Sequence, residues 1–154
     1  NVHVLELDPS EVELRPARPP RAVAPTSRLA REGDAVAAVN GGFFGPRGEA
    51  IGLLRIDGAE LFPASEGAPW VLGIPERGPL RFERRTSGTW DEVRHALAGK
   101  PLLLRGGRVV PQDLGGPRHP RTAIGQRADG VRVLLTCDGR ARESLGLSVG
   151  ELAH

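Results

Sequence analysis

The stretch Val131-Arg132-Val133-Leu134-Leu135-Thr136-Cys137 decides the expected fold class, because apolar side chains recur at every second position. A period of two is the pattern of a half-buried β-strand. The opening segment, residues 2–7, alternates in the same way. Gly (21) and Pro (14) are together unusually abundant among the 154 residues, which favours short strands joined by turns over long helices.

Further short strands are expected wherever an apolar run is bounded by turn residues. Asp57-Gly58, for example, suits a tight hairpin turn between two such runs. The predicted strands cover residues 2–7, 11–14, 35–39, 51–56, 59–62, 70–74, 80–84, 102–104, 108–110, 122–125 and 131–137.

Three short helices are expected between these strands. The first covers residues 26–31 and ends at Gly33. The second follows a capping-box pattern at 89–92, and the third begins at a second such pattern, Ser148 with Glu151. The predicted class is therefore α+β, with a mixed, mostly antiparallel sheet of short strands and two or three short helices packed against it.

The length of 154 residues suits one domain, residues 1–154, with a sizeable core. The last predicted helix has barely one turn before the chain ends, so we expect the natural protein to continue beyond His154. No apolar stretch approaches the roughly 20 residues of a membrane span. The opening residues lack the pattern of a signal peptide.

Charge argues against nucleic acid as a partner. Basic residues number 21 and acidic residues 19, which gives a net charge of +2, and the arginines are scattered rather than gathered in a stripe. Cys137 is the only cysteine, so no internal disulfide can form. Phosphate-loop, dinucleotide and zinc-binding patterns are also absent from the sequence.

Three short segments are candidates for a functional site, and the first is Asn40-Gly41-Gly42-Phe43-Phe44. Its glycines allow a positive φ and a close approach of the backbone to a ligand. Asn40 offers both a donor and an acceptor, which suits sugar hydroxyls or a phosphoryl oxygen. The alternative is a turn followed by two core phenylalanines.

The second segment is His119-Pro120-Arg121-Thr122-Ala123-Ile124-Gly125. Arg121 offers a planar guanidinium and Thr122 a hydroxyl, and either group suits a phosphodiester. His119 is a candidate proton donor near neutral pH. The alternative is a loop that enters a strand with solvent-exposed Arg and His side chains.

Asp138-Gly139-Arg140 is the third segment, and Ser144 follows it. A carboxylate at the end of a strand lies where loops gather, and such positions often carry sites. The alternative is a surface turn with an Asp–Arg ion pair, which contributes little to stability.

The phrases NGGFF, PRTAIG and DGR, followed by SLGLSVGELA, occur here in an order and spacing that resemble the phosphodiester glycosidase family. The resemblance covers most of the chain, although residues 60–110 resemble the family only in general character and contain none of these motifs. It implies an α+β domain that hydrolyses the sugar–phosphate bond of a glycosyl phosphodiester, such as an N-acetylglucosamine-1-phosphodiester. It also implies a further C-terminal segment with an Asp-Gly-Gly-Gly-Ser-like motif. The site residues that it indicates are Asp138, Arg121 and His119 as catalytic groups and Asn40, Gly41, Gly42, Phe43, Thr122, Arg140 and Ser144 as substrate-binding groups.

Cleavage of such a bond releases a phosphate, which is a far better leaving group than an alcohol. Neutralising the charge of the departing phosphate therefore matters more than protonating it. We expect Arg121, together with Arg140, to bind the phosphate. Asp138 acts as base, nucleophile or orienting group, and His119 is a weaker candidate for proton transfer.

A glycosyl phosphodiester or a polysaccharide is the expected partner, with a role in exopolysaccharide or cell-envelope glycan metabolism. Family resemblance implies an extracytoplasmic location. No cofactor is expected; Ca²⁺ is the cation that carboxylates and turn carbonyls would suit, but no loop has the spacing of a known calcium site. The alternative function is a non-catalytic module that binds anionic glycan or cell wall.

Overall fold

The computed structural model describes residues 1–19, 23–86, 90–112 and 115–154. Within these residues the chain divides into two compact units. Unit 1 comprises Asn1–Val12 and Leu102–His154, and unit 2 comprises Glu13–Pro101. One domain can contain two compact units, so a single domain over residues 1–154 stays a prediction.

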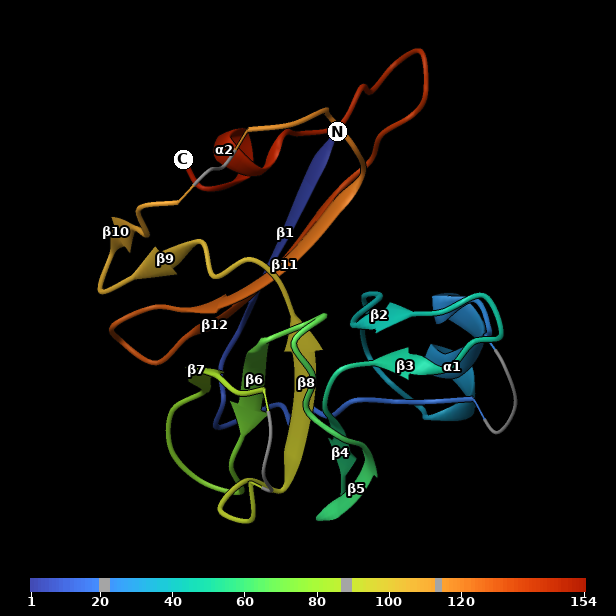
Figure 1. The fold of residues 1–154 in the computed structure, drawn as a ribbon, viewed down its shortest axis with the longest axis vertical. Helices are drawn as coiled ribbons and strands as arrows, with labels where there is room; N and C mark the ends of the chain where they lie inside the picture. Colours follow the sequence, from blue (N-terminus) through green and yellow to red (C-terminus); the bar gives the residue numbers. More distant parts are fainter. Residues whose placement is uncertain (20–22, 87–89, 113–114) are drawn as a thin grey trace. The chain divides into compact units, whose positions relative to one another are not determined.

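Strands form most of the regular structure (Figure 1), and each strand pairing within the described residues is antiparallel. In chain order the elements are β1 (Val2–Leu7), α1 (Thr26–Glu32), β2 (Phe43–Phe44), β3 (Ala50–Ile51), β4 (Leu54–Ile56), β5 (Ala59–Phe62), β6 (Trp70–Ile74), β7 (Arg81–Arg84), β8 (His95–Gly99), β9 (Leu104–Arg105), β10 (Arg108–Val109), β11 (Arg121–Gln126), β12 (Arg132–Cys137) and α2 (Val149–Leu152).

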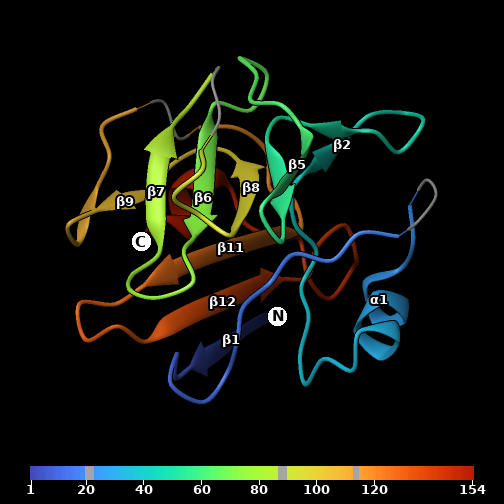
Figure 2. The same cartoon turned by 90° about the horizontal axis from the view of Figure 1, so that it is seen from below.

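Unit 1 is built on a three-stranded sheet in the order β1-β12-β11, and Figure 2 shows these strands side by side. The alternating stretch at residues 131–137 forms its central strand, β12, as predicted. A hairpin of β9 and β10 belongs to the same unit. Its turn residues, Gly106 and Gly107, both have positive φ, as a tight hairpin turn requires.

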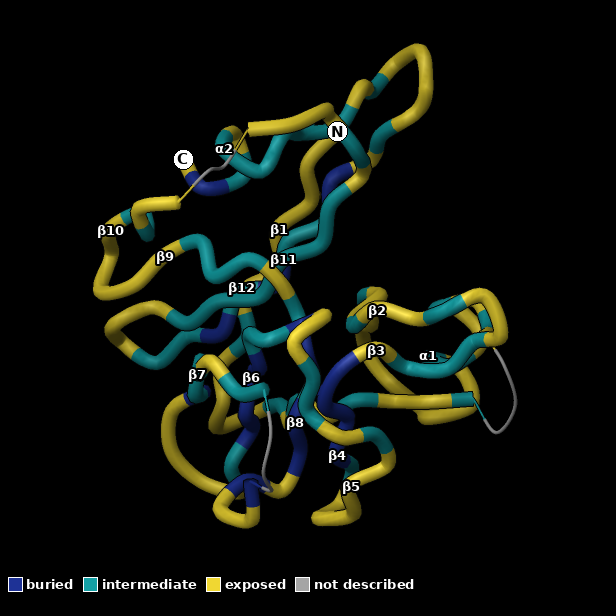
Figure 3. The backbone as a smooth tube through the Cα atoms, viewed as in Figure 1, coloured by how far each residue is buried: buried dark blue, intermediate teal, exposed yellow. Residues whose placement is uncertain are grey.

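Unit 2 contains a five-stranded sheet in the order β5-β4-β8-β6-β7. Its core is formed where β6 and β8 meet, the strands drawn mostly in dark blue in Figure 3. A cluster of buried apolar residues in this core consists of Leu53, Val71, Trp90, Val93 and Ala96.

Trp90 is held by a close contact with the backbone of β6. A Cβ atom added to Gly73 would lie 2.5 Å from the Trp90 ring, so the absence of a side chain at this position makes room for the indole. The guanidinium groups of Arg81 and Arg85 lie 5.0 and 4.9 Å from the ring centroid, within the range of cation–π attraction.

The predicted α+β class is wrong, because the described structure is mostly β. Its two helices contain seven and four residues. The helix predicted after residues 89–92 is instead the loop that leads into β8, and Thr89 itself lies outside the described residues. Apolar Trp90, Val93 and Leu97 fit a helical face, but β8 is the central strand of its sheet. A strand covered on both faces loses its alternation and cannot be told from a buried helix by periodicity.

Two predicted strands are also absent. Residues 35–39 form no strand, and Val36 is 88% exposed; a short apolar run is not by itself a buried one. Residues 11–14 are irregular as well. The strand predicted at 51–56 is broken at Gly52, whose positive φ separates β3 from β4.

Candidate active site at one end of the three-stranded sheet

The register of the three-stranded sheet brings three distant parts of the chain together at one end. Cys137, the last residue of β12, lies opposite Val2 of β1 and Arg121 of β11. The segment that follows β12 therefore lies beside the start of both neighbouring strands. We call the group of side chains at this end of the sheet the sheet-end site; it consists of Asn1, His3, His119, Arg121, Thr122, Asp138, Arg140 and Ser144.

Asp138 leaves β12 with its main chain fixed on both sides. Its N–H donates to the carbonyl oxygen of Asn1 (3.0 Å). Its own carbonyl oxygen accepts hydrogen bonds from Ser144 Oγ (2.9 Å) and Cys137 Sγ (3.1 Å). The predicted substrate-binding residue Ser144 thus holds the predicted catalytic residue Asp138 through its backbone.

The Asp138 carboxylate points to solvent and meets two side chains from β1 and its start. Oδ2 lies 3.4 Å from Asn1 Nδ2 and 3.6 Å from His3 Nε2. Within the described residues no hydrogen bond reaches Oδ1. One carboxylate oxygen is therefore oriented by the protein, and the other is available to a ligand.

Gly139 of the third segment, together with Gly146 further along the same loop, explains why this loop packs against the second segment. A Cβ atom on Gly139 would lie 2.5 Å from the nitrogen of Pro120, and one on Gly146 would lie 2.2 Å from the carbonyl oxygen of His119. Gly146 also has a φ of +90°, where other residues are strained. The 138–147 loop is closed onto the His119-Pro120 backbone, and paired hydrogen bonds between His119 and Leu147 (3.1 and 3.0 Å) complete the contact.

Arg121 binds backbone carbonyls of this loop cluster. Its Nε donates to the carbonyl oxygen of Leu147 (2.9 Å) and an Nη to that of Pro117 (3.1 Å). Side chains alternate between faces along a strand, so Arg121 and Thr122 lie on opposite faces of the sheet. The guanidinium, predicted as a phosphate ligand, thereby ties the two loops together.

Arg140 is placed differently from Arg121. It has a φ of +60°, a backbone conformation that costs energy for a residue other than glycine and that clusters at functional sites. Its side chain forms no hydrogen bond or ion pair with any described residue, and the Asp–Arg pair considered above is not formed; Asp138 faces His3 instead. Arg140 is an exposed cation beside the Asp138 carboxylate in sequence.

His119 is half-buried, and its ring is less accessible than the sequence suggests. Nδ1 is buried and has no hydrogen-bond partner among the described atoms. The main chain of His119 is enclosed by the 138–147 loop. Thr122 lies on the same row of the sheet as Thr136 and His3, since both pair with Thr136.

A charged contact fixes α2 to the loop before β11. Arg118 forms an ion pair with both carboxylate oxygens of Glu151. The capping box predicted for this helix is confirmed: Ser148 Oγ accepts from the Glu151 N–H (3.1 Å), and Glu151 Oε2 accepts from the Ser148 N–H (2.9 Å). The bond from Arg118, followed by that from Ser148, lowers the pKa of Glu151 to about 2.

The Asn40-Gly41-Gly42-Phe43 segment belongs to unit 2, where it leads into β2 beside β8. Cβ atoms added to Gly41 and Gly42 would lie 2.8 and 3.2 Å from the Leu97 side chain, and Gly42 has a φ of +69°. The Lys100 ammonium lies 5.4 Å from the Phe43 ring centroid. The glycines therefore serve close packing here, and a substrate contact for this segment stays a prediction.

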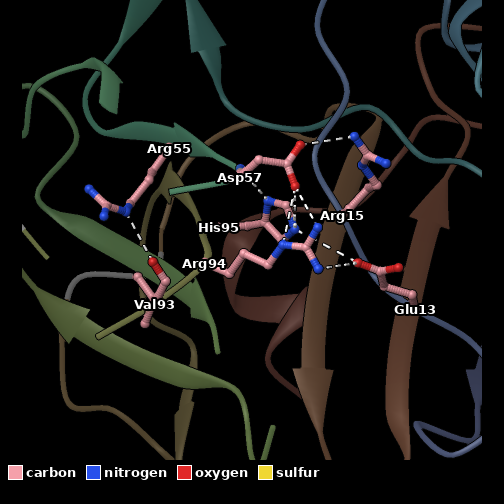
Figure 4. A network of polar contacts seen from close by, with 7 residues as sticks. All are labelled: Glu13, Arg15, Arg55, Asp57, Val93, Arg94 and His95. Atoms are coloured by element: carbon pink, nitrogen blue, oxygen red, sulfur yellow. Dashed lines mark hydrogen bonds and ion pairs between the residues drawn. The ribbon is translucent and has the colours of Figure 1, made fainter. Parts of the chain in front are cut away.

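Unit 2 also contains a buried polar network, shown in Figure 4. His95 is 2% exposed, and its Nδ1 accepts a hydrogen bond from the Asp57 N–H (3.1 Å). The neutral ring therefore carries its proton on Nε2, which lies 3.9 Å from carboxylate oxygens of Asp57 and Glu13. Arg94 and Arg15 bind the two Asp57 oxygens. Burial lowers the pKa of His95, although the carboxylate of Asp57 opposes this effect.

Among the described residues, no group of three or more His, Cys, Asp or Glu side chains is arranged to hold a metal ion. No helix in the described ranges is long and apolar enough to cross a membrane.

With this geometry established, comparison with known proteins identifies the family. The family model described as phosphodiester glycosidase matches residues 33–154. This chain belongs to the phosphodiester glycosidase family. The resemblance that the sequence motifs suggest is therefore confirmed, and both segments 119–125 and 138–147 lie within the matched range.

A solved structure supports the same assignment at the level of the fold. The catalytic domain of zebrafish N-acetylglucosamine-1-phosphodiester alpha-N-acetylglucosaminidase (NAGPA), described as auto-inhibited by its pro-peptide, is similar with a TM-score of 0.73 at 19% sequence identity. The alignment covers 99% of this chain and 64% of the zebrafish chain. The uncharacterized SPbeta prophage-derived protein YomE of Bacillus subtilis (strain 168) is 49% identical over 35 residues, which is 23% of this chain and 5% of YomE.

Sequence reasoning did not find His3 or Asn1, the two side chains that contact the Asp138 carboxylate. Both lie more than a hundred residues from Asp138 along the chain. The only available signal is the pairing of β1 with β12, and strand pairing cannot be deduced from alternation within each strand.

Proposed function

We propose that this phosphodiester glycosidase hydrolyses the bond between a sugar C1 and its phosphate in a glycosyl phosphodiester, with the sheet-end site as its catalytic centre. Membership of the family supports the reaction class. The observation that carries the site is the Asp138 carboxylate, which is fixed through its backbone, half-exposed, and open at Oδ1.

The chemistry requires stabilisation of two charges. As the C1–O bond breaks, the sugar approaches an oxocarbenium ion, which a carboxylate stabilises. The departing phosphate gains negative charge, which a guanidinium offsets. In our proposal Asp138 faces the sugar, Arg140 contacts the phosphate, and Arg121 positions the loops that carry them.

An N-acetylglucosamine 1-phosphodiester is the proposed substrate, because the similar zebrafish enzyme is named for this group. Exopolysaccharide or cell-envelope glycans are the proposed context, and an extracytoplasmic location is proposed with it. No cofactor is assigned to the reaction.

The test is hydrolysis of UDP-N-acetylglucosamine by the full-length protein in ¹⁸O-labelled water. Cleavage at C1 gives UDP and free N-acetylglucosamine, with the label on the sugar. Release of UMP with sugar 1-phosphate, or label on the phosphate, would contradict the proposal, because either result places the cleavage at phosphorus.

Arg140→Ala tests the phosphate contact, and Arg142→Ala is its matched control because Arg142 is an exposed arginine in the same loop. We expect Arg140→Ala to lower kcat/KM by about 100-fold, the loss typical of removing one charge-stabilising donor. An equal effect of the two substitutions would argue against a specific phosphate contact.

Exposed aromatic residues support a second candidate, a glycan-binding module. Phe44 is 63% exposed, and Phe43 beside it is partly exposed with Lys100 over its ring. Aromatic faces beside a cation suit an anionic polysaccharide. Saturable glycan binding that Phe44→Ala weakens, without any turnover by the wild type, would favour this function over catalysis.

A further inference from the structure

We infer that His3 is the proton-transfer residue of the sheet-end site and that Asp138 is its orienting partner. This inference rests on the proposed hydrolysis and assigns a role that the sequence motifs leave open. Of the three roles expected for Asp138, it selects that of orienting group, through Oδ2, while Oδ1 still faces the sugar. It also places proton transfer on a residue outside all three candidate segments.

The pairing of β1 with β12 brings the two groups together. His3 lies opposite Thr136, and Asp138 follows two positions later, on the same face of the sheet. His3 Nε2 is 3.6 Å from Asp138 Oδ2. The side chains of His3 and Asp138 are 66% and 55% exposed, so a substrate can reach both.

The two ring nitrogens of His3 have separate roles: one faces Asp138, and the other accepts a proton. Nε2 faces the carboxylate, which favours the tautomer with the proton on Nε2. Nδ1 then carries the lone pair, and no hydrogen bond from a described residue occupies it. This arrangement of a base oriented by a carboxylate is the general logic of acid–base pairs in hydrolases.

His119, the histidine indicated by the motifs, is less suited to this role. Its Nδ1 is buried and has no hydrogen-bond partner within the described ranges, and its backbone is closed in by Gly139 and Gly146. A proton-transfer group must come within hydrogen-bond reach of the reacting atoms. The exposed His3 ring leaves room for a substrate at that distance, whereas the main chain of His119 is enclosed by the 138–147 loop.

The proposed hydrolysis step needs only the substrate, one water molecule, His3 and Asp138. The C1–O bond breaks, and its electron pair leaves with the phosphate oxygen. A water oxygen bonds to C1, and the proton that this water loses passes to His3 Nδ1. Asp138 offsets the charge of the resulting imidazolium, which later releases the proton to solvent.

The mechanism makes activity depend on a neutral His3. Among the described residues, Asp138 is the charged side chain in contact with His3. The cross-strand neighbours on the same row, Thr136 and Thr122, are uncharged. General-base catalysis requires an unprotonated base, so the mechanism predicts that activity falls on the acid side of the pH profile.

The experiment is a pH profile of kcat/KM for sugar-phosphodiester hydrolysis by the full-length protein and its His3→Gln variant. His154→Gln is the control, since His154 is also an exposed histidine of unit 1. We expect His3→Gln to lose about 100-fold or more in kcat/KM and to lose the acid limb of the profile. His154→Gln should keep both the rate and the limb.

A wild-type protein that hydrolyses the substrate, with a His3→Gln variant that keeps its rate and acid limb, would overturn the role of His3 and leave the proposed function intact. A lower rate with an unchanged acid limb would also overturn it, because a purely structural role predicts that result. Absence of turnover in the wild type would overturn the proposed function and this inference with it.

Discussion

Replacing Gly146 with alanine tests whether the 138–147 loop is held by its contact with His119. Gly146 has a φ of +90°, and a Cβ atom there would lie 2.2 Å from the carbonyl oxygen of His119. The neighbouring atom belongs to the backbone, so it cannot move aside by a change of rotamer. The loop itself must shift.

Gly130 supplies a matched control for the backbone strain. Its φ is +93°, but nothing lies within 4 Å of the position of a Cβ atom. Gly130→Ala therefore carries the cost of a left-handed alanine alone, roughly 1–2 kcal/mol. Gly146→Ala carries the same strain and in addition an overpacking cost of about 1–3 kcal/mol.

Amide hydrogen exchange is the suitable assay, because both tryptophans, Trp70 and Trp90, lie in unit 2 and their fluorescence reports on that unit. We expect Gly146→Ala to accelerate exchange at the Leu147 and His119 amides, which hydrogen-bond each other's carbonyls. Gly130→Ala should leave these amides protected. Equal protection of them in both variants would refute the packing of this loop onto His119.

Three further perturbations follow from the contacts. Glu151→Gln should make α2 less sensitive to acid. The pKa of Glu151 is lowered from 4.5 to about 2, so the stabilising contact is complete above pH 4.5 and is lost as the pH falls toward 2. Circular dichroism at several pH values measures this loss. His95→Gln should flatten the pH dependence of the free energy of unfolding below pH 6.5. Burial lowers the pKa of His95 in the folded chain, so the unfolded chain binds the proton first and stability falls as the pH drops. Urea unfolding at several pH values measures this dependence. Gly73→Ala should destabilise the chain by about 1–3 kcal/mol and shift the Trp90 emission to the red, because a Cβ atom would overlap the indole.

Each of these has a control and a contradicting result. Glu143→Gln replaces an exposed glutamate in the same unit, and an identical acid profile for it and Glu151→Gln would disprove the role of the Arg118 contact. His154→Gln should retain the slope that His95→Gln loses; the reverse would assign that slope to another group. For Gly73→Ala, unchanged emission and stability would mean that the ring does not rest on β6.

The strands that alternate were predicted correctly from sequence, and the reason is local. In β12 burial alternates from Arg132 to Leu135, with Arg132 and Leu134 buried. β1 is exposed over Val2–Glu6 and is held in the sheet by its pairing with β12. β8 lacks this signal, since His95, Ala96 and Ala98 are all buried, and its apolar spacing mimics a helix. The α+β prediction failed at that strand, because burial of successive residues removes the alternation by which a strand is recognised.

The first candidate segment was indicated by its glycines and Asn40, the second by the side chains of Arg121, Thr122 and His119, and the third by a carboxylate at the end of a strand. Within or just after these segments, Gly42 and Gly146 have positive φ, and Gly139 and Gly146 lie against the His119-Pro120 backbone. The geometry shows what the glycines do, which is to let backbones pack closely. Which side chains converge on Asp138 depends on strand pairing, and His3 became visible only through the register of β1 with β12.

The central claim is that the Asp138 carboxylate takes part in glycosyl phosphodiester hydrolysis. The most direct test compares kcat/KM for UDP-N-acetylglucosamine hydrolysis between Asp138→Asn and Glu143→Gln, two carboxylate-to-amide changes in the same exposed loop region. We predict that Asp138→Asn loses about 100-fold or more while remaining folded, and that Glu143→Gln keeps the wild-type rate. A folded Asp138→Asn variant with the wild-type rate would contradict the claim.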